Sequence, residues 1–375
     1  MSGFGLKEHR RLVIKVGSSL LIGDDGHVHR RWLEGLADDL AMLQQQGHEV
    51  VVVSSGSIAI GSTVLGINKR RARLEDLQAA AAAGQVQLVH AYQAALGEHD
   101  IAAAQVLLTP GDTENRRRFL NARGTLARLL DRAVIPIVNE NDTVATEEIR
   151  YGDNDRLAAR VAQLVMADAL VLLSDVDGLY SADPGKNPDA EHIPEVHAVT
   201  EEILGIAGET HSDIGSGGMA TKVQAARIAT HAGCSTVVAS GAIERPISAL
   251  AAGGKCTVFR AEGTPAAARK QWLAGVLEVR GELRLDDGAA RALTAGNSLL
   301  PVGVVEVVGN FRRGDVVTLV DGNGNELGRG LAEYSSDDAG LLAGCQSEHI
   351  EERLGYRGRS VMIHRDELVL FGNDR

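Results

Sequence analysis

Residues 11–19 of the chain read RLVIKVGSS, and this stretch decides how the sequence around it is interpreted. Its first six residues form an apolar run rich in β-branched side chains, which is typical of a strand buried in a parallel sheet. A glycine and two serines follow at once, and the backbone N–H groups and hydroxyls of such a turn can converge on an anion. Lys15 is next to last in the run, so its side chain could reach the same point. A surface lysine before an ordinary turn fits these residues equally well.

The alternation of apolar runs and helical stretches continues to about residue 260. Helical periodicity covers about 30–46, 74–96, 115–132, 155–166 and 221–232. Between these stretches lie the apolar runs EVVVVSSG, AAAQVLLT, AVIPIV, DALVLLSD and STVVAS. Apolar strands separated by helices predict an α/β fold, a three-layer αβα sandwich with a mainly parallel sheet. Such sheets bind ligands at the carboxyl ends of their strands.

The pattern of predicted secondary structure changes near residue 264, which indicates a domain boundary there. The segment TPAAARKQWLAG is interpreted as a linker with a helical turn, and short β runs with Gly-rich turns follow it. We predict a first domain over residues 1–262, a linker over 263–279 and a small β-rich domain or barrel over 280–375. Two domains are also what a length of 375 residues favours.

Composition excludes several classes of protein. The net charge of −12 argues against a partner held mainly through phosphate neutralisation. The three cysteines lie far apart, so disulfides and a zinc site are not expected, and a reducing cytosol fits. The amino terminus lacks the apolar core of a signal peptide, and no apolar run approaches the ~18 residues of a membrane helix.

Two further loops repeat the pattern of glycine and serine after a strand or before a helix. The run VVVSSGSIAIG at 51–61 repeats it at the second strand. The loop GSGGMATK at 215–222 matches the letters of a dinucleotide fingerprint, but no buried strand precedes it, and it is not a P-loop either. A Gly-rich turn leading into a helix, with Lys222 in the first turn, could hold a phosphate. A flexible surface loop is the alternative.

An acidic stretch, VNENDTVATEEIRYGDND at 138–155, contains three Asn, three Asp and three Glu against a single Arg. A metal cage, catalytic carboxylates, a substrate clamp and a solvated turn are all compatible with it. The absence of a fixed ligand spacing argues against the metal cage. The twelve histidines are scattered and show no metal-binding spacing.

Taken in order, VIKVGSS, VSSGSIAIG, VNENDTVAT, YGDNDRLAA, LLSDVDGLYSADP and GSGGMATKVQAA resemble the glutamate 5-kinases of the amino acid kinase family. The resemblance covers essentially the whole chain, and the tail resembles the PUA domain that bacterial members often carry. It implies ATP-dependent phosphorylation of the side-chain carboxylate of L-glutamate to L-glutamyl 5-phosphate and ADP, the first step of proline biosynthesis. It also implies a kinase domain over 1–262 and a PUA domain over 280–375.

The resemblance also assigns roles to residues. Asp155 would orient two catalytic lysines, Lys15 and Lys222, although it could merely cap a helix. Glutamate would contact Ser55, Gly56, Asn139, Asp142 and Asn154. ATP would contact Lys15, Gly17, Ser18, Ser174, Asp175, Ser216, Gly217, Gly218, Met219, Ala220, Thr221 and Lys222. No residue is assigned as a metal ligand, because Mg²⁺ is expected to bind the ATP phosphates. The family often has Thr where this chain has Ser174, and Asp175 could be a simple turn residue.

Other functions remain open at this point. A kinase of the same fold could act on aspartate, N-acetylglutamate, carbamate or UMP, although the NEND and GDND motifs and the PUA tail favour glutamate. An RNA-binding PUA protein is a further alternative, but residues 276–375 contain 11 Lys and Arg against 17 Asp and Glu. The family also implies a cytoplasmic dimer or tetramer, feedback inhibition by proline, and coupling to glutamyl phosphate reductase. Neither a membrane nor a nucleic acid is expected as a partner.

Overall fold

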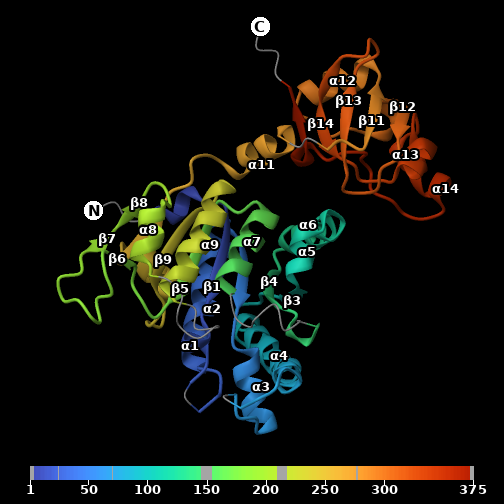
Figure 1. The fold of residues 1–375 in the computed structure, drawn as a ribbon. Helices are drawn as coiled ribbons and strands as arrows, with labels where there is room; N and C mark the ends of the chain where they lie inside the picture. The colour runs from blue at the N-terminus through green and yellow to red at the C-terminus, as the bar shows by residue number, and fades with distance from the viewer. Residues whose placement is uncertain are drawn as a thin grey trace. The chain divides into compact units, whose positions relative to one another are not determined.

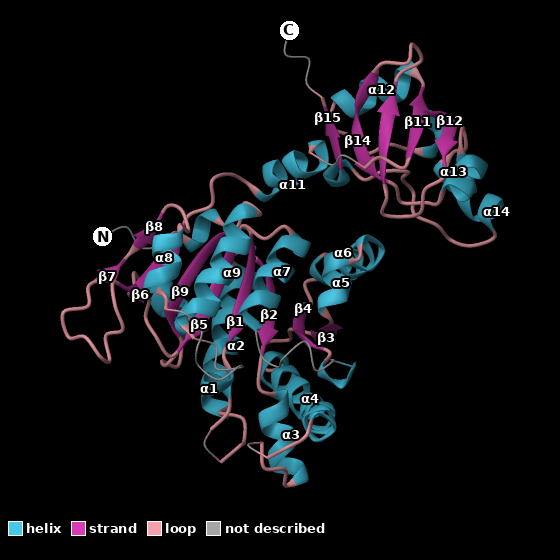
Figure 2. Cartoon of the chain, viewed as in Figure 1, coloured by secondary structure: helices cyan, strands magenta, loops and turns pink. Residues whose placement is uncertain are grey.

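The computed structural model describes residues 4–23, 25–69, 71–144, 154–208, 218–275 and 278–371. The chain divides into two compact units, Met1–Pro265 and Ala266–Arg375. Figure 1 traces the chain through its helices and strands, and Figure 2 shows the strands of the first unit as a layer between helices. No helix among the described residues is long and apolar enough to cross a membrane.

The sheet of the first unit has eight strands. Their order is β3 (Ala103–Leu108), β4 (Ile135–Glu140), β2 (Glu49–Ser54), β1 (Arg11–Val16), β5 (Ala169–Ser174), β9 (Ser235–Ser240), β10 (Cys256–Phe259) and β8 (Glu195–Val196). The first six run parallel, whereas β10 is antiparallel to β9. Strands β6 (Leu179–Tyr180) and β7 (His192–Ile193) form a separate antiparallel ribbon. The predicted mainly parallel sheet is confirmed.

Helices cover both faces of this sheet, as predicted. One face packs against α2 (Arg30–Gln45), α4 (Leu74–Gly97) and α10 (Pro246–Ala251). The other packs against α6 (Arg116–Leu130), α7 (Asn154–Val165) and α9 (Met219–His231). Shorter helices are α1 (Ser18–Leu21), α3 (Ser57–Leu65), α5 (Pro110–Glu114) and α8 (Glu201–Ile206), with single turns η1 (Leu6–Glu8) and η2 (Asp142–Val144).

Alternation along β1 decides where Lys15 points. Leu12, Ile14 and Val16 belong to the core on the α2 and α4 side, and Val13 belongs to the core on the α7 and α9 side. Because successive side chains of a strand point to opposite faces, Lys15 shares the face of Val13. The only charged side chain in this buried strand interior is therefore directed toward α7 and α9.

Helices α3 and α4 approach each other through two glycines. A Cβ on Gly61 would lie 1.7 Å from the carbonyl oxygen of Ala80, and one on Gly84 would lie 1.8 Å from that of Ser57. Both neighbours are backbone atoms, so neither can move aside without shifting a helix. The contact fixes Ser57 and the middle of α4 beside each other.

Gly84→Ala is expected to lower the free energy of unfolding of the first unit by at least about 2 kcal/mol, because overpacking against backbone forces the helices apart. Gly97→Ala is the matched control on the same helix, since nothing lies within 4 Å of its Cβ position. That variant should be unchanged or more stable by up to about 1 kcal/mol. Urea unfolding of both variants checks this, and equal stabilities would show that the close helix contact is wrong.

The second unit is built on a five-stranded sheet. Its order is β12 (Val304–Gly309), β11 (Gly281–Leu285), β13 (Val316–Val320), β14 (Glu326–Leu331) and β15 (Leu368–Leu370), with β11 and β13 parallel and the other neighbours antiparallel. Its helices are α11 (Pro265–Ala274), α12 (Asp287–Thr294), α13 (Ser336–Leu342) and α14 (Ile350–Leu354), with turns η3 (Pro301–Gly303), η4 (Ser347–His349) and η5 (Arg365–Glu367). The guanidinium of Arg269 on α11 pairs with the buried Glu367 at 2.6 Å.

Candidate active site

The polar side chains expected at the site come from strands that end at one edge of the sheet. Strand β1 lies between β2 and β5, and β4 adjoins β2. All four run parallel, so their carboxyl ends meet. Lys15, Ser54, Asn139 and Ser174 stand at or next to these ends. The sequence predicted polar loops after the first two of these strands, and the family resemblance placed Asn139 and Ser174 at the site.

Lys15, Asp155 and Lys222 form a buried triad. Asp155 is the second residue of α7, and Lys222 lies in the first turn of α9. The Lys15 Nζ lies 2.6 Å from Asp155 Oδ1, and the Lys222 Nζ lies 3.3 Å from Asp155 Oδ2. The three residues are only 6%, 1% and 3% exposed, respectively. The structure therefore brings together the two lysines and the carboxylate that the family resemblance groups in the sequence.

The charges of the triad do not balance. Burial alone would raise the pKa of Asp155, but the Lys15 and Lys222 ammonium groups outweigh it and hold that pKa below its usual value. Thr221 Oγ1 donates a further hydrogen bond to Asp155 Oδ2 at 2.9 Å. Within the triad itself, one carboxylate faces two ammonium groups in a place with little water. Such a place stabilises an anion much more strongly than the same charges would in water.

A chain of side-chain amides lies beside the triad. Asn154, next to Asp155, donates from Nδ2 to Ser55 Oγ at 2.7 Å and to Asn139 Oδ1 at 3.1 Å. Asn139 donates from Nδ2 to Ser57 Oγ at 3.2 Å and to Gln85 Oε1 at 2.8 Å. The hydrogen bonds therefore hold the Asn139 amide, near the carboxyl end of β4, and the Asn154 amide, at the start of α7, in one arrangement.

Asp142 is a buried carboxyl group with few partners. It begins η2, and its side chain accepts one weak hydrogen bond, from Ser57 Oγ at 3.5 Å. Burial raises its pKa to about 6, and the contact with Ser57 offsets this only partly. No cation contacts Asp142 among the residues that the structure describes, and a buried carboxylate of this kind is a natural place for a positively charged ligand group.

The glycines and serines of the predicted site lie at the ends of strands or at the starts of helices. Gly56 has φ of +111° ahead of α3, a conformation that favours glycine, and Gly17 precedes α1. Ser18 is exposed at the start of α1. The buried Ser174 donates from Oγ to Asp175 Oδ1 at 2.8 Å. Gly218 precedes α9, which begins with Met219, Ala220 and Thr221, whereas Ser216 and Gly217 lie outside the described residues.

Sequence reasoning missed three polar side chains that support the site. Ser57 connects Asn139 with Asp142, Gln85 accepts from Asn139, and the buried Tyr92 donates from its hydroxyl to Ser54 Oγ at 3.0 Å. Gln85 and Tyr92 are seven residues apart on α4, so they share one face of that helix. In the sequence, only their spacing on an alanine-rich helix could have indicated them. That spacing does not show which face of the helix is buried, so the structure is needed to identify them.

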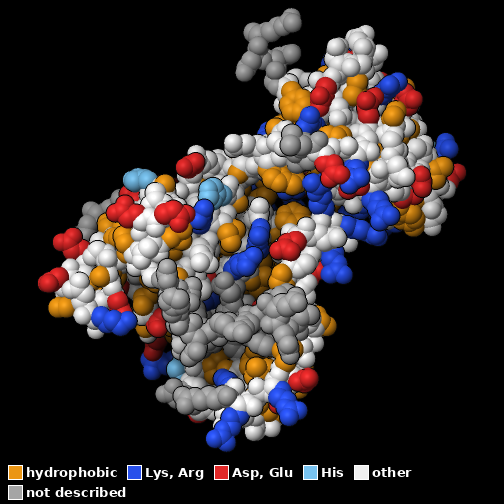
Figure 3. All heavy atoms as spheres, viewed as in Figure 1, with side chains coloured by type: hydrophobic (Ala, Val, Ile, Leu, Met, Phe, Trp, Pro, Cys, Tyr) orange, Lys and Arg blue, Asp and Glu red, His pale blue; other side chains and the backbone are white. Residues whose placement is uncertain are grey.

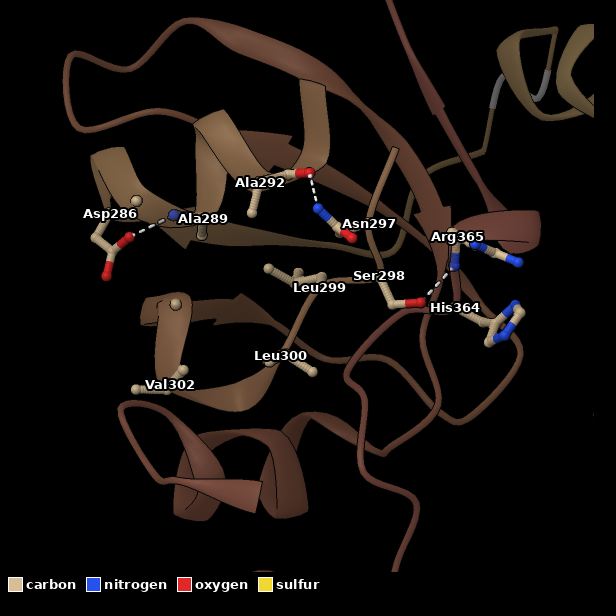
Figure 4. A pocket seen from close by; sticks show the side chains of 12 residues that line it. Asp286, Ala289, Ala292, Asn297, Ser298, Leu299, Leu300, Val302, His364 and Arg365 are labelled. Atoms are coloured by element: carbon tan, nitrogen blue, oxygen red, sulfur yellow. Dashed lines mark hydrogen bonds between the residues drawn. The ribbon is translucent and has the colours of Figure 1, made fainter. Parts of the chain in front are cut away.

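A cavity of about 660 Å³ lies in the second unit, lined by residues of α12, η3 and η5 (Figure 4). Its polar groups serve local structure. Ala289 N donates to Asp286 Oδ1 at 2.7 Å, Asn297 Nδ2 donates to the Ala292 carbonyl at 3.1 Å, and Arg365 N donates to Ser298 Oγ at 3.0 Å. No comparable charge imbalance marks the described lining of this cavity. The candidate active site is therefore the strand-end cluster of the first unit.

Comparison with known proteins gives matches in both units. The model of the amino acid kinase family matches residues 10–240, and the model of the PUA domain matches residues 275–354. A glutamate 5-kinase of Paramagnetospirillum magneticum is 56% identical, over 97% of this chain and 98% of the relative. Glutamate 5-kinases of Rhodopseudomonas palustris and Nitrobacter hamburgensis are each 53% identical, over 97% and 99% of this chain and 97% and 98% of the relatives.

Proposed function

The chain belongs to the amino acid kinase family, and we propose that it transfers the γ-phosphoryl group of ATP to the side-chain carboxylate of L-glutamate, giving L-glutamyl 5-phosphate and ADP. The observation that carries this proposal is the buried triad of Lys15, Asp155 and Lys222 beside an amide-lined site that contains the buried carboxyl group of Asp142. High identity to glutamate 5-kinases over nearly the full length of the chain supports the choice of substrate.

The reaction needs no general base, because a glutamate side chain with a reference pKa of about 4.3 is already ionised at neutral pH. The difficulty is to bring one anion against another, so positioning and charge stabilisation dominate phosphoryl transfer. The ammonium groups of Lys15 and Lys222 would contact the transferred phosphoryl group. Asp155 would keep both aimed at it and offset their mutual repulsion.

Recognition of glutamate would use the other side of the amide chain. The Asn154 side-chain oxygen and the Asp142 carboxylate would receive the ammonium group of the substrate. Ser55 and Gly56 would line the same pocket, and Asn139 would hold the Asn154 amide in place. These contacts leave the side-chain carboxylate of glutamate free to face the lysines.

The nucleotide would lie along the starts of α1 and α9. Gly17, Ser18, Ser174, Asp175 and the segment 216–221 would contact it, with Lys222 reaching the phosphates. Among the residues that the structure describes, no group of three or more His, Cys, Asp or Glu side chains could hold a metal ion. We propose that Mg²⁺ is bound by the phosphates of ATP and by water, as is common for this ion.

Lowering the pH through about 6 is expected to reduce kcat/KM for L-glutamate, because the pKa of Asp142 is raised to about 6 and protonation removes its charge. The loss should approach tenfold per pH unit, while the glutamate side chain, with a pKa of about 4.3, stays largely ionised. The same raised pKa makes the contribution of Asp142 to stability fall as pH rises from about 4 to 6.

Initial rates between about pH 5 and pH 7.5 measure this effect directly. Asp142→Asn should have a low kcat/KM without the step near pH 6. A wild-type profile that stays flat across this range would remove Asp142 from ammonium binding.

The choice of substrate is tested by ADP release with a panel of acceptors. With Mg²⁺ present, L-glutamate should give the highest kcat/KM among glutamate, aspartate, N-acetylglutamate, carbamate and UMP. A higher value for any other acceptor would assign the chain to another kinase of the family. The same proposal includes four further properties. The chain would be inhibited by proline, would form a dimer or tetramer, would be functionally coupled to glutamyl phosphate reductase and would be cytoplasmic.

RNA binding by the second unit is not favoured. Its 276–375 segment is acidic, and Figure 3 shows acidic as well as basic side chains on its visible face. Arg313, from the pair of adjacent arginines, contacts the buried Glu333 at 3.1 Å, and Arg359 contacts the same carboxylate at 3.2 Å. Both guanidinium groups are partly neutralised by this carboxylate, which weakens their attraction for phosphates.

A further inference from the structure

The direction of each amide in the active-site chain is fixed by backbone groups. The backbone N–H of Glu140 donates to Asn139 Oδ1 at 2.9 Å, and the Ser54 carbonyl accepts from Asn154 Nδ2 at 3.2 Å. A backbone N–H can only donate and a carbonyl can only accept. These backbone contacts therefore determine which atom of each side-chain amide is the oxygen and which is the nitrogen.

This fixed direction also determines how Gln85 is oriented. Asn139 must present Nδ2 toward α4, so Gln85 must offer its oxygen there, and the contact is 2.8 Å long. The Gln85 Nε2 group then points away from Asn139. Gln85 is 7% exposed and its Nε2 has no hydrogen-bond partner in the described chain.

A second atom is left over at the other end of the chain. Asn154 is 5% exposed, and its Oδ1 likewise lacks a partner among the described residues. Buried donors and acceptors are almost always paired in folded proteins, so each of these two atoms calls for a partner, either a water molecule or a ligand group. Here one leftover atom is a donor and the other is an acceptor.

The leftover atoms and Asp142 form a complementary set. Ser57 Oγ accepts from Asn139 at 3.2 Å and donates to Asp142 at 3.5 Å, which keeps Asp142 within the same cluster as Gln85. An acceptor and a carboxylate suit an ammonium group, and an N–H donor suits a carboxylate. Both ligand groups occur side by side in the head group of an α-amino acid.

We propose that Gln85 is a specificity-determining residue whose Nε2 donates to the α-carboxylate of the amino-acid substrate. The ammonium group of the same substrate would lie against Asn154 Oδ1 and Asp142. This assignment rests on the proposed function for the identity of the amino acid. A purely structural role for Gln85, as a tether for Asn139, is the competing explanation.

Two variants separate these explanations. Gln85→Glu keeps an oxygen toward Asn139 but replaces the N–H donor by an anionic oxygen that repels a carboxylate. Gln85→Met keeps the length of the side chain and removes both polar atoms. The matched control is Gln87→Met, which makes the same change at an exposed position of α4.

Calorimetric binding of two ligands to the full-length variants tests the proposal. L-Glutamate carries the α-carboxylate, and 4-aminobutanoate lacks it but keeps the ammonium and the other carboxylate. We expect Gln85→Glu to weaken glutamate binding about 100-fold and Gln85→Met about 10-fold, the range for a hydrogen bond to a charged group. Binding of 4-aminobutanoate, measured by competition, should change less than about threefold in both, because the interacting group is absent.

Equal weakening of both ligands would overturn the proposal in favour of the tether, and so would glutamate binding that matches the Gln87→Met control. Thermal midpoints of the variants show whether the fold is intact. The binding measurement does not depend on turnover. If the wild-type chain binds glutamate through Gln85 but does not phosphorylate it, the proposed function fails while the assignment of Gln85 stands.

Discussion

Asp155→Asn is expected to lower kcat by about 1,000-fold, comparable to the loss of a principal electrostatic group in an active site. Asparagine keeps the shape of the side chain but removes the negative charge between Lys15 and Lys222, whose Nζ atoms lie 2.6 Å and 3.3 Å from the carboxylate. Two buried ammonium groups would then repel each other, and either one moves away or one loses its proton. In both cases the pair no longer aims two charges at the phosphoryl group.

The same substitution should also destabilise the fold. Removing one partner of a buried ion pair typically costs about 3–5 kcal/mol, because the remaining charge is buried without compensation. If Asp155 only capped α7, the loss would stay below about 1 kcal/mol and kcat would hardly change. Asp287→Asn, in the exposed first turn of α12, is the matched control. Steady-state kinetics and urea unfolding on both variants distinguish a catalytic triad from a helix cap.

Lys222→Met is expected to lower kcat by about 100- to 1,000-fold, with much smaller changes in KM, because its charge stabilises the transition state more than the bound substrates. Stability should hardly change. Asp155 keeps its closer partner Lys15 at 2.6 Å, so its carboxylate is not left without a cation. The expected effect on stability differs from that of Asp155→Asn because Asp155 is the one carboxylate that both lysines contact within the triad.

The control for this substitution is Lys186→Met, which removes an exposed lysine that pairs with Asp183 at 3.0 Å. Its kcat should remain within about twofold of wild type, as expected for a surface site. Near-normal turnover of Lys222→Met would exclude a role in the chemistry. A large loss of stability in Lys222→Met would show that the lysine is mainly structural.

The fold was predictable because apolar runs and helical periodicity extend over many residues of the sequence. Short apolar runs rich in β-branched residues, such as residues 11–16, favour strands in a covered sheet, and the helix expected at about 74–96 is observed as Leu74–Gly97. The short strands β8 and β10 were not predicted. Runs of two and four residues show no usable periodicity, and nothing local indicates that β10 runs antiparallel to β9.

The site was predictable where polar residues follow strands or open helices. Lys15, Asp155 and Lys222 occupy such positions, the family resemblance grouped them, and strand alternation explains why Lys15 faces the two helices that carry the others. Gln85 and Tyr92 were missed because a polar residue in an alanine-rich helix is usually solvated. Whether such a side chain faces the sheet depends on the close approach of α3 and α4, which is a property of the tertiary structure.

The central claim is that the chain phosphorylates the side-chain carboxylate of L-glutamate, and trapping of the acyl phosphate tests it most directly. The chain is incubated with ATP, Mg²⁺, L-glutamate and hydroxylamine, which converts an acyl phosphate into a stable hydroxamate. We predict that the γ-glutamyl hydroxamate forms in step with ADP, and that Lys222→Met forms it at a rate lower by about 100-fold or more. ADP release without hydroxamate, or hydroxamate formation from another acid but not from L-glutamate, would contradict the account.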